Sequence, residues 1–141
     1  QLVVTGPDTA DLRSDLGLVQ RLGLTGHVST PGEVSDADLA GLMRLSCAVA
    51  VRSRSEGFGL PVLEAMACGT PAIVPAGGAL EEVGGAHAIV VDPTDAGSVA
   101  QGIVQALETR EGLRTTLTEQ ASRFTWGATA QAIEEVWEGL A

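Results

Sequence analysis

The sequence is poor in aromatic residues and in positive charge. Its 141 residues contain no tyrosine and no lysine, and aromatic residues make up only 3% of the chain. The hydrophobic share of 45% therefore comes mostly from smaller side chains, so we expect a core of Ala, Val, Leu and Ile. The net charge of −10 argues against DNA, RNA or an anionic membrane as a partner.

Sequence signals of several other functions are also missing. No apolar run approaches membrane-spanning length and no signal peptide is visible, so membrane association is expected only through parts outside this chain. No His and Cys spacing suits zinc, and neither a Gly-x-Ser-x-Gly elbow nor a Gly-Lys-Ser/Thr phosphate loop occurs. The Gly6-Pro7-Asp8 turn lacks the three-glycine dinucleotide fingerprint, so NAD binding is not predicted.

The two cysteines, Cys47 and Cys68, both lie in apolar sequence contexts. We predict that they are buried free thiols, because unpaired cysteines behave as small apolar side chains. Free thiols persist in a reducing compartment, so the expected location is cytoplasmic.

Short apolar strands alternate with amphipathic helices along the whole chain. Strands are expected at Leu2–Thr5, His27–Ser29, Ala48–Val51, Ala72–Val74 and Ala88–Val91. Helices are expected at Asp8–Leu22, Asp36–Leu45, Pro61–Gly69, Asp95–Leu107, Glu111–Phe124 and Trp126–Leu140, with N-caps at Ser35 or Asp36 and near Asp95. This alternation predicts an α/β fold with a Rossmann-like parallel sheet and helices on both faces. Residues 1–141 are expected to form a single domain.

The most informative stretch lies in the middle of the chain. The apolar run Cys47–Val51 predicts a buried strand, and the glycine-bearing residues after it predict a loop. Pro61 suits the first position of a helix, and Gly69 suits its end. A helix start leaves backbone N–H groups unpaired and partially positive. Because Gly57 and Gly59 carry no side chain that would block a ligand, we predict an anion-binding cradle of backbone amides.

Two glutamates, Glu56 and Glu64, flank this cradle. A carboxylate is a poor neighbour for a phosphate but a good acceptor for vicinal hydroxyls, as in the ribose contact of dinucleotide-binding folds. Glu64, near the helix start, can accept a ribose diol beside a diphosphate. Glu56, across the loop, can reach a hydroxyl of a group beyond the diphosphate. The simpler alternatives are an ordinary helix-dipole carboxylate for Glu64 and a solvated loop acid for Glu56.

The segment between these glutamates resembles the glutamate–seven residues–glutamate motif of the group-one (family four) retaining glycosyltransferases, which adopt the GT-B fold. Further segments are similar to other parts of that family, and they are Leu2–Asp8, Gly32–Leu39, Gly77–Val83, Val91–Pro93 and Phe124–Trp126. The resemblance therefore covers nearly the whole chain. It implies that the chain is the C-terminal, donor-binding half of a GT-B fold.

The resemblance also implies an activity. It is the transfer of a sugar from a nucleotide diphosphate sugar (a GDP-, UDP- or ADP-sugar) to a hydroxyl acceptor, with retention at the anomeric carbon and without metal ion or cofactor. Glu56 would be the catalytic residue that holds the donor sugar, and Glu64 would hold the ribose. The donor diphosphate would contact the backbone of Gly57, Phe58, Gly59, Leu60 and Val62.

The chain departs from the family pattern at several points. Arg52 precedes Ser53 where a proline is usual, and Glu81 stands where a proline usually precedes Glu-Val. The Arg and Lys that hold the diphosphate in the family, and the N-terminal acceptor domain, are absent. The chain begins at what should be the second strand of the domain. We therefore expect a fragment that is inactive alone, with a non-catalytic nucleotide-binding module or a generic interaction domain as alternatives.

Two further features have open interpretations. Arg52 and Arg54 flank the motif and are either surface residues or contacts to a phosphate or base. The Gly77-Gly78 pair is either a tight turn or a point of close backbone approach to the donor.

Overall fold

The computed structural model describes residues 1–53 and 56–140, which divide into two compact units, Gln1–Leu39 and Ala40–Ala141. Arg54, one of the two flanking arginines considered above, lies outside the described residues. Arg52 is exposed. The expectation of a single domain stays a prediction.

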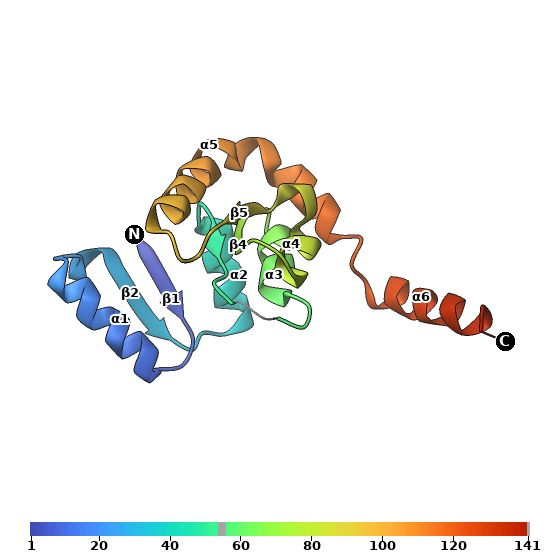
Figure 1. The fold of residues 1–141 in the computed structure, drawn as a ribbon, viewed down its shortest axis with the longest axis horizontal. Coiled ribbons are helices and arrows are strands. Elements are labelled where there is room, and N and C mark those ends of the chain that lie inside the picture. Colours follow the sequence, from blue (N-terminus) through green and yellow to red (C-terminus); the bar gives the residue numbers. More distant parts are fainter. Residues whose placement is uncertain (54–55, 141) are drawn as a thin grey trace. The chain divides into compact units, whose positions relative to one another are not determined.

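The first unit contains two parallel strands and a helix (Figure 1). Strand β1 (Leu2–Thr5) pairs with β2 (Val28–Gly32), and α1 (Ala10–Arg21) connects them, with a short 3-10 turn at Thr25–His27 before β2. Thr9 is the N-cap of α1, because its hydroxyl accepts a hydrogen bond from the N–H of Leu12 at 3.1 Å. Strand β2 begins one residue later than predicted and extends further.

Helix α2 (Asp36–Leu45) leads into the second unit. Its start agrees with the prediction: Ser35 Oγ accepts from the N–H of Asp38 at 3.2 Å and donates to the Asp38 carboxylate at 2.7 Å. The end of the helix is held by the buried Thr70, whose hydroxyl donates to the Met43 carbonyl at 2.6 Å. Ser35 is therefore the N-cap among the two candidates.

The second unit contains a parallel sheet in the order β3-β4-β5. Strands β4 and β5 are labelled in Figure 1. Its strands are β3 (Val49–Ala50), β4 (Ala72–Pro75) and β5 (Ile89–Val91), and its helices are α3 (Leu60–Ala67), α4 (Ala79–Gly84), α5 (Ala96–Ala121) and α6 (Trp126–Glu138). The core is aliphatic, as predicted, with Val62, Val74 and Leu117 fully buried. The fold class is α/β with parallel strands, as predicted.

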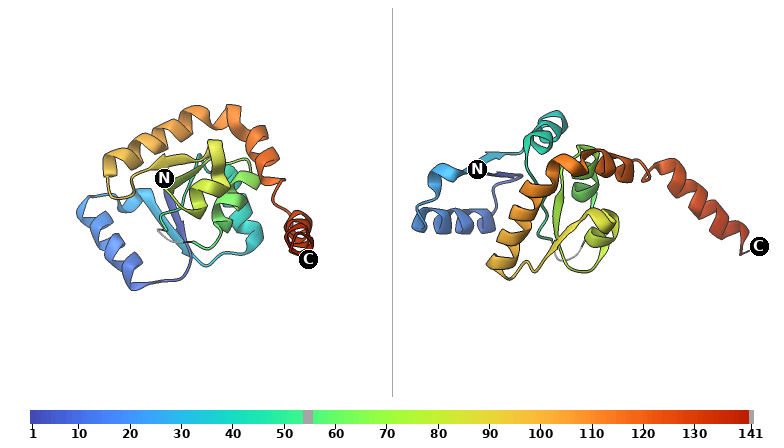
Figure 2. Two further views of the ribbon diagram at one scale, coloured as in Figure 1. Left: turned by 45° about the vertical axis from the view of Figure 1, so that its right-hand side comes forward. Right: turned by 90° about the horizontal axis from the view of Figure 1, so that it is seen from above.

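Helix α5 is one continuous helix of 26 residues, where the sequence predicted two helices with a break between Leu107 and Glu111 (Figure 2). The intervening residues contain no glycine or proline to end a helix. The Thr109 hydroxyl donates to the Gln105 carbonyl one turn earlier at 2.8 Å, and Arg110 donates to the Arg44 carbonyl at 3.0 Å. The prediction of a break was therefore wrong.

Two other expectations differ from the structure. The short helix α4, just after the Gly77-Gly78 turn, was not among the predicted helices. The cysteines are free, but the prediction that they are buried was wrong, because Cys47 is exposed and Cys68 is half-buried. Cys47 lies before the first residue of β3, and Cys68 is the C-cap of α3 with its thiol 3.8 Å from the Ala40 carbonyl.

Helix α6 begins at the Thr125 N-cap, whose hydroxyl accepts from the N–H of Ala128 at 3.1 Å. It exposes large apolar side chains, among them Trp126 and Trp137. Among the residues that the structure describes, no helix combines the length and apolar character needed to cross a membrane.

Two glycines of α5 allow a matched test of its packing and continuity. An alanine at buried Gly102 would place its Cβ 2.6 Å from Val91 Cγ1, so we expect Gly102→Ala to destabilise the chain by about 1–3 kcal/mol. An alanine at Gly112 meets nothing within 4 Å, so replacing this helix-interior glycine should stabilise by about 0.5–1 kcal/mol. Urea unfolding of both variants measures the difference. Equal effects, or no gain at Gly112, would contradict a continuous, sheet-packed α5.

Candidate functional site

The carboxyl ends of β3, β4 and β5 share one edge of the sheet, because the strands are parallel. Three connecting segments leave this edge: the loop that contains Glu56, the Gly77-Gly78 turn and the segment that begins at Asp92. In open parallel sheets, ligands bind at this edge. The segment predicted to bind a ligand therefore lies at the edge where a ligand is expected.

Gly59 is the N-cap of α3 and has a left-handed backbone with φ +100°. A Cβ at this position would lie 2.9 Å from Leu80 Cδ2 and 3.6 Å from Leu80 Cα, in α4. The left-handed φ therefore favours glycine, and any larger residue would also require the Leu80 side chain to move. Gly57 differs, because it has no left-handed φ and a Cβ there would meet nothing within 4 Å. Its missing side chain leaves open space beside the loop.

The backbone amides of the loop fall into two groups. The N–H groups of Val62 and Leu63 donate to the Gly59 carbonyl, at 3.0 Å and 3.3 Å, and the Val62 side chain is fully buried. The N–H groups from Gly57 to Leu60 donate to no acceptor among the described residues. The open part of the predicted cradle is thus its first half, while the Val62 amide is already engaged inside the helix.

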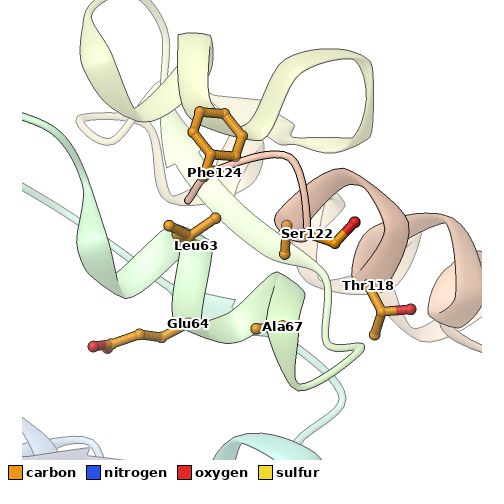
Figure 3. Close-up of a pocket in the computed structure, with 7 residues that line it drawn as sticks. Leu63, Glu64, Ala67, Thr118, Ser122 and Phe124 are labelled. Atoms are coloured by element: carbon orange, nitrogen blue, oxygen red, sulfur yellow. The ribbon is translucent and has the colours of Figure 1, made fainter. Parts of the chain in front are cut away.

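Both predicted carboxylates are exposed. Glu56 lies in the loop and Glu64 lies on α3, and neither side chain forms a hydrogen bond or ion pair within the described part of the chain. Figure 3 shows the Glu64 carboxylate extending away from Thr118 and Ser122. Both acids are therefore available to accept hydrogen bonds from a ligand.

The side chain of Phe58 anchors the loop. Its ring packs edge-on against Phe124, just beyond α5, with ring centroids 5.9 Å apart and an interplanar angle of 79°. Such aromatic pairs contribute about 0.5–1.5 kcal/mol beyond their buried area. Sequence reasoning considered only the backbone of Phe58 and missed this contact. The sequence contains one indication of a ring contact, because Phe58 and Phe124 are the only two phenylalanines in a chain that is poor in aromatic residues.

Among the hollows on the described surface of this unit, two bear on the site. The first, of about 420 Å³, lies between α3 and the end of α5 (Figure 3). It is lined by Leu63, Glu64, Ala67, Thr118, Ala121, Ser122 and Phe124. The hydroxyls of Thr118 and Ser122 already donate to carbonyls of α5, at 2.8 Å and 2.7 Å. This hollow does not include the open amides, so it is not the anion cradle that the sequence predicted.

The second hollow, of about 400 Å³, lies at the carboxyl edge of β4 and β5. It is lined by Pro75, Ala76, Gly77, Asp92 and Pro93. The Asp92 carboxylate accepts from the N–H and hydroxyl of Thr94, at 2.8 Å and 2.6 Å. Within the described residues, no group of three or more His, Cys, Asp or Glu side chains gathers as a metal ion would require.

A matched pair of glycine variants tests the geometry of the loop. We expect Gly59→Ala to destabilise the chain by at least about 1–2 kcal/mol, because its backbone is left-handed and Leu80 must also move. Gly57→Ala should change stability by less than about 0.5 kcal/mol, because its Cβ enters open space. Thermal unfolding of both variants gives the comparison. A neutral Gly59→Ala would mean that Gly59 is neither left-handed nor crowded by Leu80 in solution.

Comparison with known proteins places this chain in a family. The family model for glycosyl transferases group 1 matches residues 1–124. The O-antigen chain mannosyltransferase B of Escherichia coli is 37% identical over 120 residues, which cover 82% of this chain and 32% of that protein. The D-inositol 3-phosphate glycosyltransferase of Corynebacterium jeikeium (strain K411) is 33% identical over 129 residues, which cover 87% of this chain and 30% of that protein. The chain thus spans about a third of the length of these relatives.

Solved structures give the same result. Sucrose-phosphate synthase from Thermosynechococcus elongatus matches 99% of this chain, and 38% of its own length, with a TM-score of 0.81 and 32% identity. Anabaena HepE in complex with UDP and glucose matches 97% of this chain, and 40% of its own length, with a TM-score of 0.78 and 25% identity. The fold is the Rossmann-like C-terminal half of the GT-B architecture. The chain belongs to the group 1 glycosyl transferases.

Proposed function

We propose that this chain is the donor-binding half of a retaining glycosyltransferase, which transfers a sugar from a nucleotide diphosphate sugar to a hydroxyl acceptor. The observation that carries the proposal is the run of open amides from Gly57 to Leu60 at the start of α3, beside the exposed Glu64. Membership of the family supports sugar transfer. The similarity to HepE, which was solved with UDP and glucose, supports a nucleotide diphosphate sugar as donor.

In this proposal, the donor diphosphate lies on the N–H groups of Gly57, Phe58, Gly59 and Leu60. These amides stabilise the negative charge that builds on the departing diphosphate, which is the main catalytic effect that the site offers. Donor binding requires little reorganisation of the loop, because the Phe58 ring already packs against Phe124. The N–H of Val62 could bind the diphosphate only if it gave up its hydrogen bond to the Gly59 carbonyl. We therefore assign it to stabilising the start of α3 rather than to contacting the donor.

The two glutamates divide the rest of the donor between them. Glu64 accepts hydrogen bonds from the ribose hydroxyls, and Glu56 holds and orients the donor sugar at the reacting carbon. Both carboxylates are exposed and without a hydrogen-bonding partner in the described residues, as this assignment requires. Retention at the anomeric carbon and the absence of a metal ion are part of the proposal and rest on the family resemblance.

The acceptor site belongs, in this proposal, to an N-terminal domain of a longer enzyme that acts in the cytoplasm. The chain alone then transfers no sugar, because transfer requires both reactants to be held together. A non-catalytic nucleotide-binding module would bind the same donor, and turnover by the longer enzyme separates that alternative from a glycosyltransferase.

Replacing Glu64 tests the ribose contact. We expect Glu64→Ala to weaken binding of a nucleoside diphosphate about tenfold or more, because a charge-assisted hydrogen bond to the ribose is lost. The thermal midpoint should move by no more than about 2 °C, because the exposed side chain has no hydrogen bond or ion pair to lose among the described residues. NMR titration of the chain with UDP, GDP and ADP measures the affinity. Glu134→Ala, on an exposed position of α6, is the control for the change in charge. Unchanged affinity with lowered stability would leave Glu64 a structural residue.

Replacing Glu56 separates the two acids. We expect Glu56→Gln to leave the affinity for the bare nucleoside diphosphate within about twofold, because the carboxylate faces the sugar rather than the nucleotide. The same change should lower the affinity for the intact sugar nucleotide or the kcat of the longer enzyme. Both ligands are titrated against Glu56→Gln and Glu64→Ala. If the two variants weaken nucleoside diphosphate binding equally, with no added effect of the sugar, the division of roles is wrong.

A further inference from the structure

The turn after β4 is held by a hydrogen bond that the family resemblance does not predict. The carboxylate of Glu81, in the first turn of α4, accepts from the backbone N–H of Gly77 at 2.5 Å. Gly77 and Gly78 both have left-handed backbones, with φ of 79° and 81°, and a Cβ on either would meet nothing within 4 Å. Two backbone hydrogen bonds also bound the turn, from the N–H of Ala76 to the Val91 carbonyl at 3.3 Å and from the N–H of Glu82 to the Gly78 carbonyl at 3.2 Å. Because its two glycines could adopt other conformations, the bond to Glu81 is a further restraint on the turn.

The chain that leaves this turn packs against the cradle. Leu80, next to Glu81, is buried at 3% exposure. Its Cδ2 and Cα lie 2.9 Å and 3.6 Å from the position that a Gly59 Cβ would occupy, and the Ala79 carbonyl oxygen lies 3.9 Å from it. The Gly59 carbonyl in turn accepts the N–H groups that begin α3. A shift of the α4 start is therefore transmitted to the loop that carries the open amides.

We propose that Glu81 is a positioning residue for the anion cradle. Its carboxylate fixes the Gly77-Gly78 turn, the turn fixes Ala79 and Leu80, and Leu80 holds Gly59 and the amides beside it. Glu81 touches no part of the donor in this account. Its importance for donor binding rests on the proposed function of those amides, whereas its effect on the loop geometry does not.

A neighbouring acid provides the matched control. Glu82 lies in the same first turn of α4 and carries the same charge, but its side chain is exposed and has no hydrogen bond within the described part of the chain. A general effect of negative charge at a helix start would be shared by both residues. An effect confined to Glu81 comes from the bond to Gly77.

The proposal is tested with the ¹⁵N-labelled chain and three variants. Glu81→Gln keeps a neutral acceptor for the N–H of Gly77, so it should leave the Gly59 amide near its wild-type resonance. Glu81→Ala removes the acceptor and should move both the Gly77 and the Gly59 resonances. Glu82→Ala should move neither.

Nucleotide affinity provides the second readout, with UDP, GDP and ADP as the probes. Glu81→Ala should lower the affinity for the nucleotide that binds best by about threefold to tenfold. Glu81→Gln should restore most of that affinity, and Glu82→Ala should leave it unchanged. If the wild type binds none of the three nucleotides, the proposed function fails, and the Gly59 resonance still decides whether Glu81 positions the loop. An unmoved Gly59 amide in Glu81→Ala, or an equal effect of Glu82→Ala, overturns the proposal.

Discussion

A side chain at position 59 would collide with Leu80, so the starts of α3 and α4 can approach this closely because residue 59 is glycine. The candidate site depends on this close approach. The left-handed backbone of Gly59 turns the chain from the loop after β3 into α3, and its carbonyl accepts the first N–H groups inside the helix. Because Leu80 is buried in α4, its side chain holds the start of α3 against the start of α4, which belongs to the connection between β4 and β5. The amides just before the helix are left pointing at no acceptor among the described residues, and the partial positive charge of a helix start remains there for an anion.

The sequence predicted the fold class because the relevant signals are local. Short aliphatic runs indicated the strands, Pro61 and Gly69 bounded α3, and side chains such as Ser35 and Asp95 capped the helices after them. The mistake at α5 arose from expecting a break where no residue ends a helix, and the structure adds a distant anchor, Arg110 on the Arg44 carbonyl. The burial of Cys47 was overestimated because it was inferred from apolar neighbours in the sequence. The strand begins only at Val49, so Cys47 lies outside it and is exposed.

The candidate site was predicted only in part for the same reason. The positions of Gly57, Gly59 and Glu64 around a helix start can be inferred from spacing along one loop and one helix. The contacts that hold the loop join residues far apart in the chain: Phe58 with Phe124, and Gly59 with Leu80. The hydrogen bond between Glu81 and Gly77 joins residues only four positions apart, yet it was not predicted, because the sequence indicated only that Glu81 replaces a proline that is usual in the family. Local spacing thus identifies the groups that face a ligand, whereas tertiary packing decides which amides stay open.

The measurement that tests this account most directly is a map of backbone amide shifts in the ¹⁵N-labelled chain as a nucleotide diphosphate sugar is added. UDP-, GDP- and ADP-sugars are titrated in turn, because the base is not assigned. The account predicts that the largest shifts fall on the amides from Gly57 to Leu60, with smaller ones along the first turn of α3. Shifts concentrated instead at Thr118, Ser122 and Phe124, around the hollow between α3 and α5, would contradict it, as would the absence of any saturable shift.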